Sequence, residues 1–330
     1  MAVTFITQQI SSLSQMKRND LIYLVLIFPF AFILLSAKGQ QVNDSSFNTH
    51  LINPAYSNRH PLVLIDAGHY NAFVTLNRIQ PFSNLIRADG CNVDIVKRRF
   101  SPNLLSNYDI CVIFTAQGGS DESDSTEFSA FSDSEIEALV NWIKNGGSLL
   151  FGVDHSPFNY AGNKLLESLG IGLSFGRIED SVFSEGGIES GSDGRRGSLI
   201  FSRQNELLGN HVITSGRNYQ EQINKVVTDG GQALKPPKGS ITLFRISNTA
   251  YNSGIGNSDS YRMPVGGYNA QAIAFTLGKG RAVITADCSM WTAQLVKLNN
   301  NWVKYGMSRT DTDNRQFALN VMHWLSHIIN

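Results

Sequence analysis

The feature that most constrains this chain is an alternation of apolar runs with amphipathic segments, which begins at residue 61. The runs at 61–66, 108–116 and 148–154 are almost wholly apolar, as in strands that are buried on both faces, and 91–97 forms a further strand. Strands of this kind, separated by helices, predict a mostly parallel sheet that is covered on both sides. We therefore expect an α/β fold of the flavodoxin-like, doubly wound class.

The segments between these runs have the spacing of amphipathic helices. Residues 74–90 place apolar side chains at helical intervals and end in a glycine, and 131–147 form the clearest helix. Ser132 and Glu135 stand at the two positions of a capping box, which marks where the second helix begins. Further helices are expected at 162–171 and 312–329.

The middle and the later part of the chain differ from this alternation. Residues 172–262 are rich in Gly and Ser, and we predict an insertion of strands and long loops there. Residues 271–287 contain two strand-like runs around a Gly-Lys-Gly turn, which predicts an antiparallel hairpin. The whole of 61–330 is expected to form a single domain.

The N-terminus has the layout of a secretory signal peptide. From Met16 a Lys-Arg pair is followed by an apolar run at 21–35 and then by small residues up to Gly39. We predict a signal peptide over 1–39, a linker over 40–60, and a folded part that is exported to the periplasm or the extracellular space. The alternative is an uncleaved membrane anchor, although the apolar run is shorter than the roughly 20 residues of a membrane span.

Charge and cysteine content exclude two classes of protein. The 27 basic and 27 acidic side chains cancel, which removes the electrostatic basis for a nucleic-acid partner. The 3 cysteines form at most one disulfide, so the chain is no disulfide scaffold. Cys288 is a nucleophile by type, but no neighbour in the sequence would activate its thiol.

Polar side chains follow several of the predicted strands at the point where each strand ends. Because parallel strands end at one edge of a sheet, where this fold class binds ligands, we expect these side chains to form one pocket. For Asp287 and Ser289, this expectation depends on the direction of the last strand. The set is Asp66, His69 and Asn71 after the first strand, Gln117 after 108–116, Asp154 and His155 after 148–154, and Asp287 and Ser289 after the hairpin.

We predict that Asp66, His69, Asp154 and His155 form the polar centre of a catalytic site, with Asn71, Gln117, Asp287 and Ser289 as binding residues. Two mechanisms fit such a set. A divalent metal would activate water, or a histidine oriented by an aspartate would act as a general base. No metal-site motif is present, and each of these residues also has an ordinary structural role in a loop.

The pairing of these side chains is expected across strands. Asp154 and His155 are adjacent on an extended stretch, where neighbouring side chains point to opposite faces, so they are not expected to form a dyad. The pairs His69–Asp154 and His155–Asp66 are favoured instead.

Two segments resemble the class I glutamine amidotransferase-like superfamily. One is the opening strand with its helix, and the other is "GGSLLFGVDHSPF" at 146–158. True amidotransferases carry the nucleophilic cysteine of "G-x-C-x-G" in the second segment, where this chain has Asp154. Their late His–Glu partners are replaced by "TADCSMWTAQ". The resemblance implies the fold and argues against amidotransferase chemistry.

A closer resemblance is to an exported, uncharacterised branch of that superfamily, a domain-of-unknown-function family. Its segments "D-x-x-H-x-N", "G-G-S-L-L-L…D-H-x-P-F" and "N-R-Q-F-x-L-N-x-x-H-W-L" match this chain at 66–71, 146–158 and 314–325. The resemblance spans about 60–328 and implies a fold rather than a reaction.

Three functions remain open at this point. The first is an exported hydrolase-like enzyme that acts on an unknown small molecule, saccharide or peptide. The second is a non-catalytic envelope protein that binds a saccharide or peptide in the same pocket. The third is a structural envelope component whose Gly/Ser-rich insertion is the contact surface. A membrane partner is expected only if the N-terminal segment is not cleaved.

Overall fold

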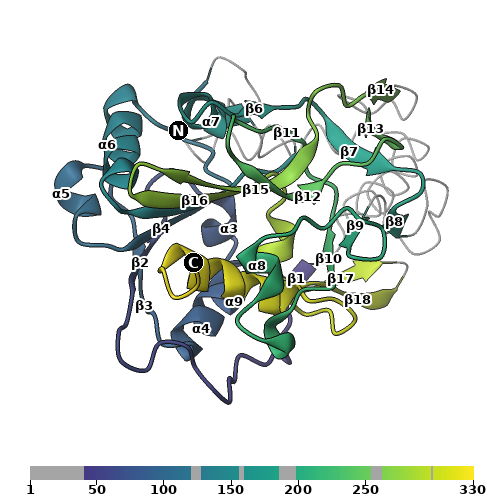
Figure 1. The fold of residues 1–330 in the computed structure, drawn as a ribbon, viewed down its shortest axis with the longest axis horizontal. Helices are drawn as coiled ribbons and strands as arrows, with labels where there is room; N and C mark the ends of the chain where they lie inside the picture. Colours follow the sequence, from purple (N-terminus) through teal and green to yellow (C-terminus); the bar gives the residue numbers. More distant parts are fainter. Residues whose placement is uncertain (1–40, 120–127, 156–159, 186–197, 254–261, 299) are drawn as a thin grey trace, which may run out of the picture. The chain divides into compact units, whose positions relative to one another are not determined.

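The structure is a computed structural model that describes residues 41–119, 128–155, 160–185, 198–253, 262–298 and 300–330 (Figure 1). The described residues all belong to one compact unit, Gln41–Asn330. The predicted signal peptide lies outside the described residues. Within them, no helix combines the length and the apolar character that a membrane crossing requires.

Among the described residues of the unit Gln41–Asn330, a sheet of nine strands forms the centre. Its first five strands pair in parallel, and the remaining ones are antiparallel. The expected α/β fold with a large parallel sheet is confirmed. The order is β3 (Asn92–Val96), β2 (Leu62–Asp66), β4 (Ile110–Phe114), β5 (Ser148–Gly152), β16 (Gly280–Thr285), β15 (Ala270–Leu277), β11 (Leu234–Lys235) and β6 (Gly172–Leu173), and β12 (Ile241–Arg245) also pairs with β15.

The predicted hairpin is confirmed as β15–β16, with Leu277 opposite Gly280. Gly278 in its turn has a φ of +62°, and a side chain there would meet the Lys144 carbonyl oxygen at 2.4 Å. β16 also pairs in parallel with β5, from Arg281–Ser148 onward. The last strand therefore ends at the same edge of the sheet as β5, which is the direction that the pocket hypothesis requires.

Helices cover both faces of the sheet (Figure 1). Alternate residues of β4 enter two different cores: Val112 packs with α4 and α9, and Ile113 packs with α5, α6 and α7. All five residues of β4 and of β5 are buried, which is why these strands are continuous apolar runs. The helices are α3 (Ala72–Thr75), α4 (Gln80–Ala88), α5 (Pro102–Leu105), α6 (Asp133–Lys144), α7 (Asn163–Ser168), α8 (Val212–Ser215) and α9 (Asn314–Leu325).

The helices bear out one local prediction and correct another. Ser132 and Glu135 form the predicted capping box at the start of α6. The single helix expected over 74–90 is instead divided into α3 and α4. Asn77 between them has a φ of 57°, which interrupts the helix, and Pro81 fits the first turn of α4, where its missing N–H is not needed.

In the described part of the chain, short strands around the central sheet form three small sheets, and three 3₁₀ turns accompany them. Strand β1 lies within the stretch that was expected to be a linker. Parts of the predicted insertion join the central sheet as β6, β11 and β12. The small sheets are β1 (Gln41–Asn43), β17 (Ala293–Leu298) and β18 (Asn301–Gly306); β8 (Ser184–Glu185), β9 (Ser198–Ser202) and β10 (Lys225–Thr228); and β7 (Arg177–Asp180), β13 (Ala250–Ser253) and β14 (Arg262–Pro264), with 3₁₀ turns at Tyr160–Gly162, Tyr219–Glu221 and Ser289–Trp291.

Candidate functional site

The polar residues after β2 form a closed network inside the protein. The His69 Nδ1 atom lies 2.9 Å from both carboxylate oxygens of Asp66, and its Nε2 atom lies 2.9 Å from Glu135 Oε1. His69 and Asp66 are both fully buried. The imidazole lies between the rings of Phe100 and Phe131, at centroid distances of 4.6 and 4.5 Å. Both ring nitrogens are therefore occupied by protein partners.

The two carboxyl groups around His69 favour the charged form of its imidazole. Burial alone would lower the pKa of His69, but the hydrogen bonds and charges of Asp66 and Glu135 outweigh it and raise that pKa. Burial alone would raise the pKa of Glu135, but hydrogen bonds from Ser132 and His69 lower it. The network joins the end of β2 to the start of α6 and gives His69 a structural role.

Two of the predicted binding residues belong to the same network. The Asn71 side chain donates to Asp66 Oδ2 at 3.0 Å and to the Phe114 carbonyl, and the Gln117 backbone N–H donates to the His69 carbonyl at 3.1 Å. None of these residues lines the pocket described next. The structure therefore forms neither of the expected pairs, His69–Asp154 and His155–Asp66. His69 pairs with Asp66 instead.

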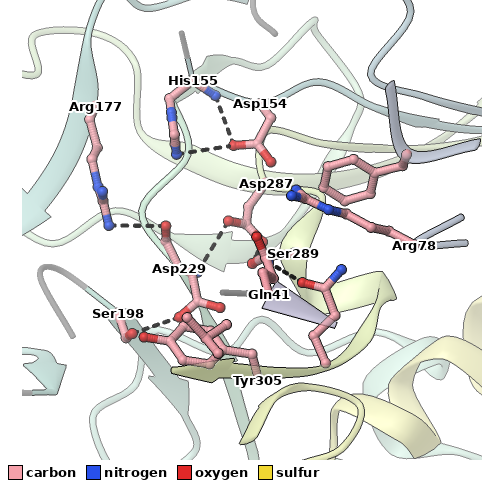
Figure 2. A pocket seen from close by; sticks show the side chains of 13 residues that line it. Gln41, Arg78, Asp154, His155, Arg177, Ser198, Asp229, Asp287, Ser289 and Tyr305 are labelled. Atoms are coloured by element: carbon pink, nitrogen blue, oxygen red, sulfur yellow. Dashed lines mark hydrogen bonds and ion pairs between the residues drawn. The ribbon is translucent and has the colours of Figure 1, made fainter. Parts of the chain in front are cut away.

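The other predicted residues line a pocket of about 410 Å³ beyond the carboxyl ends of β5 and β16 (Figure 2). The sheet of β1, β17 and β18 supplies part of its wall through Gln41, Gln294 and Tyr305. Its charged lining consists of Arg78, Asp154, His155, Arg177, Asp229 and Asp287.

The side chains of Asp154 and His155 lie close together, whereas the sequence predicted that they would point to opposite faces. The His155 backbone N–H donates to Asp154 Oδ1 at 2.8 Å, and the His155 Nε2 atom lies 3.8 Å from the same oxygen. The chain bends at His155 instead of continuing as a strand, so the two side chains turn to the same side. The second oxygen of Asp154 accepts the backbone N–H of Cys288 at 3.2 Å, which links the ends of β5 and β16.

Asp287 lies at the centre of the hydrogen bonds that shape the pocket. Its Oδ1 atom accepts the Ser289 hydroxyl at 2.6 Å and the Met290 backbone N–H at 3.1 Å. Its Oδ2 atom accepts the backbone N–H of Asp229 at 3.1 Å. The residue is nevertheless only 1% exposed. These contacts hold its carboxyl group in one orientation.

Three charged residues of this pocket were not predicted from the sequence, namely Arg78, Arg177 and Asp229, and the last of them contacts Asp287. Asp229 follows β10, and its carboxylate accepts the Ser198 hydroxyl at 2.7 Å. The next two residues are glycines, and a side chain on Gly231 would meet the Ala286 carbonyl oxygen at 2.1 Å. The Asp-Gly-Gly sequence after a strand-like run is thus the signal that marks this close approach.

The carboxyl groups of the pocket differ in their affinity for protons. Burial, together with the charges of Asp154 and Asp229, raises the pKa of Asp287 to about 8. Burial also raises the pKa of Asp229, to about 6, against hydrogen bonds from Ser198 and the charge of Arg177. At neutral pH, Asp287 is therefore mostly protonated and is able to donate a proton.

The thiol of Cys288 does not belong to the pocket. The residue is fully buried, and its Sγ atom lies 3.5 Å from the Val153 carbonyl oxygen and against Gly152. Burial, reinforced by the charges of Asp154 and Asp287, raises the pKa of this thiol well above its ordinary value. Cys288 is a packing residue in this position.

The described residues contain no group of three or more His, Cys, Asp or Glu side chains arranged to hold a metal ion. The divalent metal considered from the sequence therefore has no defined ligand set among them.

Comparisons with known proteins concern the fold. No protein-family model and no curated protein matches this chain. Among solved structures, the mmIFT52 N-terminal domain is similar over 80% of this chain and 97% of its own, with a TM-score of 0.55 and 14% identity. A ThuA-like protein from Bacteroides uniformis ATCC 8492 covers 84% of this chain and 93% of its own, with a TM-score of 0.39 and 11% identity. A cytoplasmic protein from Salmonella typhimurium LT2 covers 80% and 98%, with a TM-score of 0.44 and 15% identity. At these identities the first likeness supports the α/β fold alone.

Proposed function

We propose that this protein is an exported hydrolase that cleaves glycosidic bonds, with Asp287 as the general acid and Asp154 as the general base. The observation that carries the proposal is the pair of carboxyl groups in one pocket, of which Asp287 keeps its proton at neutral pH. Glycoside hydrolases usually use two carboxyl groups as acid and base, and the surroundings of the acid raise its pKa.

Two protons move in the proposed step. Asp287 gives its proton to the glycosidic oxygen, and the bond between that oxygen and the anomeric carbon breaks, so the alcohol leaves. Asp154 takes a proton from water, and the water oxygen forms the new bond to the anomeric carbon. Asp154 then returns its proton to solvent and Asp287 is protonated again, which restores the starting state. His155, 3.8 Å from Asp154, orients the base.

The arrangement favours a saccharide over a peptide as substrate. The Ser289 hydroxyl donates to Asp287, and the buried thiol of Cys288 does not line the pocket, so neither is an activated nucleophile. Among the described residues, no hydrogen bond joins the carboxyl groups of Asp154, Asp229 and Asp287, whereas aspartic peptidases share a proton between two of them.

The rival function is saccharide binding without catalysis. It is favoured by one observation: both oxygens of Asp287 already accept hydrogen bonds from the protein, which is typical of a fixed binding group.

The test is hydrolysis of a panel of α- and β-linked 4-nitrophenyl glycosides by the mature chain. We expect Asp287→Asn and Asp154→Asn each to lower kcat by about 10²- to 10⁴-fold. Activity should also decline as the pH rises through about 8, where Asp287 loses its proton. Glu137→Gln, an exposed carboxyl on α6, is the matched control. Binding of saccharides without any turnover would favour the rival function.

Two broader expectations belong to the same proposal. We infer that the fold is flavodoxin-like and related to the class I glutamine amidotransferases, which the parallel order β3-β2-β4-β5-β16 supports. We also infer export, on the signal-peptide pattern of 16–39, with an N-terminal membrane anchor as the alternative. N-terminal sequencing of the protein recovered outside the cytoplasm separates these two outcomes.

A further inference from the structure

Arg78 differs from the other charged residues of the pocket because its guanidinium has no hydrogen-bond acceptor among the described residues. No described residue forms an ion pair with it either. Arg177, by contrast, donates to the Asp229 carbonyl at 3.1 Å. Figure 2 shows the Arg78 side chain pointing into the pocket, toward Asp154.

The position of Arg78 is set by its surroundings. Its backbone N–H donates to the Phe73 carbonyl at 2.7 Å, directly after the left-handed residue Asn77. Its guanidinium lies over the Phe73 ring, 5.5 Å from the centroid, in a cation–π contact. The side chain is half-buried, so its N–H groups are held in place and partly removed from water. Such a group is prepared to bind a planar anion.

The charge of the pocket permits an anionic ligand. Arg78 and Arg177 contribute two positive charges, while Asp287 is mostly neutral at pH 7. Asp154 and Asp229 are the other two carboxyl groups of the lining, so apart from Asp287 the acidic side chains do not outnumber the two arginines. A monoanionic carboxylate is repelled less by these two carboxyl groups than a dianionic phosphate.

We propose that Arg78 binds the carboxylate of an acidic saccharide, so that the substrates of this site contain a hexuronate. The planar guanidinium pairs with a carboxylate through two parallel hydrogen bonds, which orients the sugar ring as well as holding it. This inference rests on the proposed glycosidase function, which makes the substrate a saccharide. It adds that the saccharide is negatively charged.

Binding is tested first, without any requirement for turnover. Titration calorimetry of the whole mature protein with sodium D-glucuronate should show binding, and D-glucose should bind about 10- to 100-fold more weakly. Arg78→Gln should weaken glucuronate binding by the same factor, and Arg78→Lys should weaken it less, because the charge remains. Arg59→Gln is the control, since Arg59 is exposed and pairs with Asp109 outside the pocket. Melting temperatures establish that the variants are folded.

The second measurement compares 4-nitrophenyl glucuronides with the matching glucosides. A kcat/KM about 10- to 100-fold higher for the glucuronide, lost in Arg78→Gln, supports the inference. Equal kcat/KM values for the two substrates overturn it and leave the proposed hydrolase standing. Arg78-dependent glucuronate binding without hydrolysis of either substrate supports the carboxylate site and refutes the proposed enzyme. Tighter binding of inorganic phosphate than of glucuronate overturns the assignment to a carboxylate.

Discussion

Replacement of Asp287 by Asn should change how the stability of this protein depends on pH. Burial and the charges of Asp154 and Asp229 raise the pKa of Asp287 from 3.8 to about 8. One pKa unit corresponds to about 1.4 kcal/mol, so this carboxyl group lowers the free energy of unfolding by about 5 kcal/mol between pH 4 and pH 8.

The sign follows from the protons bound in each state. The unfolded chain releases this proton near its ordinary pKa of 3.8, whereas the folded chain keeps it up to about pH 8. In this interval the folded state binds more protons, so stability declines by up to about 1.4 kcal/mol for each pH unit. The amide of the Asp287→Asn variant binds no proton, so the variant loses that part of the dependence.

The assay is urea unfolding at several values between about pH 5 and pH 7, followed by tryptophan fluorescence. The amide of the variant keeps an oxygen that accepts the Ser289 hydroxyl, but its NH₂ group faces the Asp229 backbone N–H, and two donors cannot form a hydrogen bond. The variant should therefore be less stable than the wild type at low pH. This deficit should shrink by about 1.4 kcal/mol for each pH unit. Glu137→Gln should parallel the wild type. Equal pH dependence in wild type and Asp287→Asn would refute a raised pKa at this site.

Three further predictions concern the remainder of the structure. His69→Ala should lower the free energy of unfolding by about 3 to 5 kcal/mol, because it leaves two buried carboxylates without their partner. The pKa of His69 is raised, so this loss should be complete below about pH 6.5 and decline as the pH rises through the folded-state pKa; a pH-independent loss in urea titrations would contradict the network. Gly231→Ala should lower the free energy of unfolding by about 2 kcal/mol more than Gly239→Ala, as measured by thermal unfolding. Both glycines have a positive φ, but only a side chain on Gly231 would meet the Ala286 backbone. Equal losses in the two variants would argue against that contact. The three buried cysteines should stay unreactive toward a thiol reagent until the protein is unfolded, and one fast-reacting thiol in the native protein would show that the burial is incomplete.

Local patterns in the sequence were sufficient to predict the central strands. β2, β4 and β5 are buried on both faces, and burial of that kind requires a continuous apolar run, which is visible without any partner strand. The capping box of α6 and the turn of the hairpin β15–β16 were predictable for the same reason, because each depends on residues close together in the chain.

The break between α3 and α4 shows the limit of periodicity. Apolar side chains keep a helical spacing across 74–90, yet Asn77 adopts a left-handed conformation. Helical spacing reports which residues face the core, and two short helices with a turn between them satisfy it as well as one long helix.

The composition of the site was decided by tertiary structure. The sequence correctly placed Asp66 and Asp154 at the carboxyl ends of strands, but the Nε2 atom of His69 is occupied by Glu135, which lies 66 residues further along the chain. Asp229 and Arg78 enter the pocket because β10 and the turn after α3 pack beside the ends of β5 and β16. The sequence by itself determined the sheet and where its strands end, since burial acts on each run separately. Which polar groups meet there depends on how distant segments pack, and only the tertiary structure decided that.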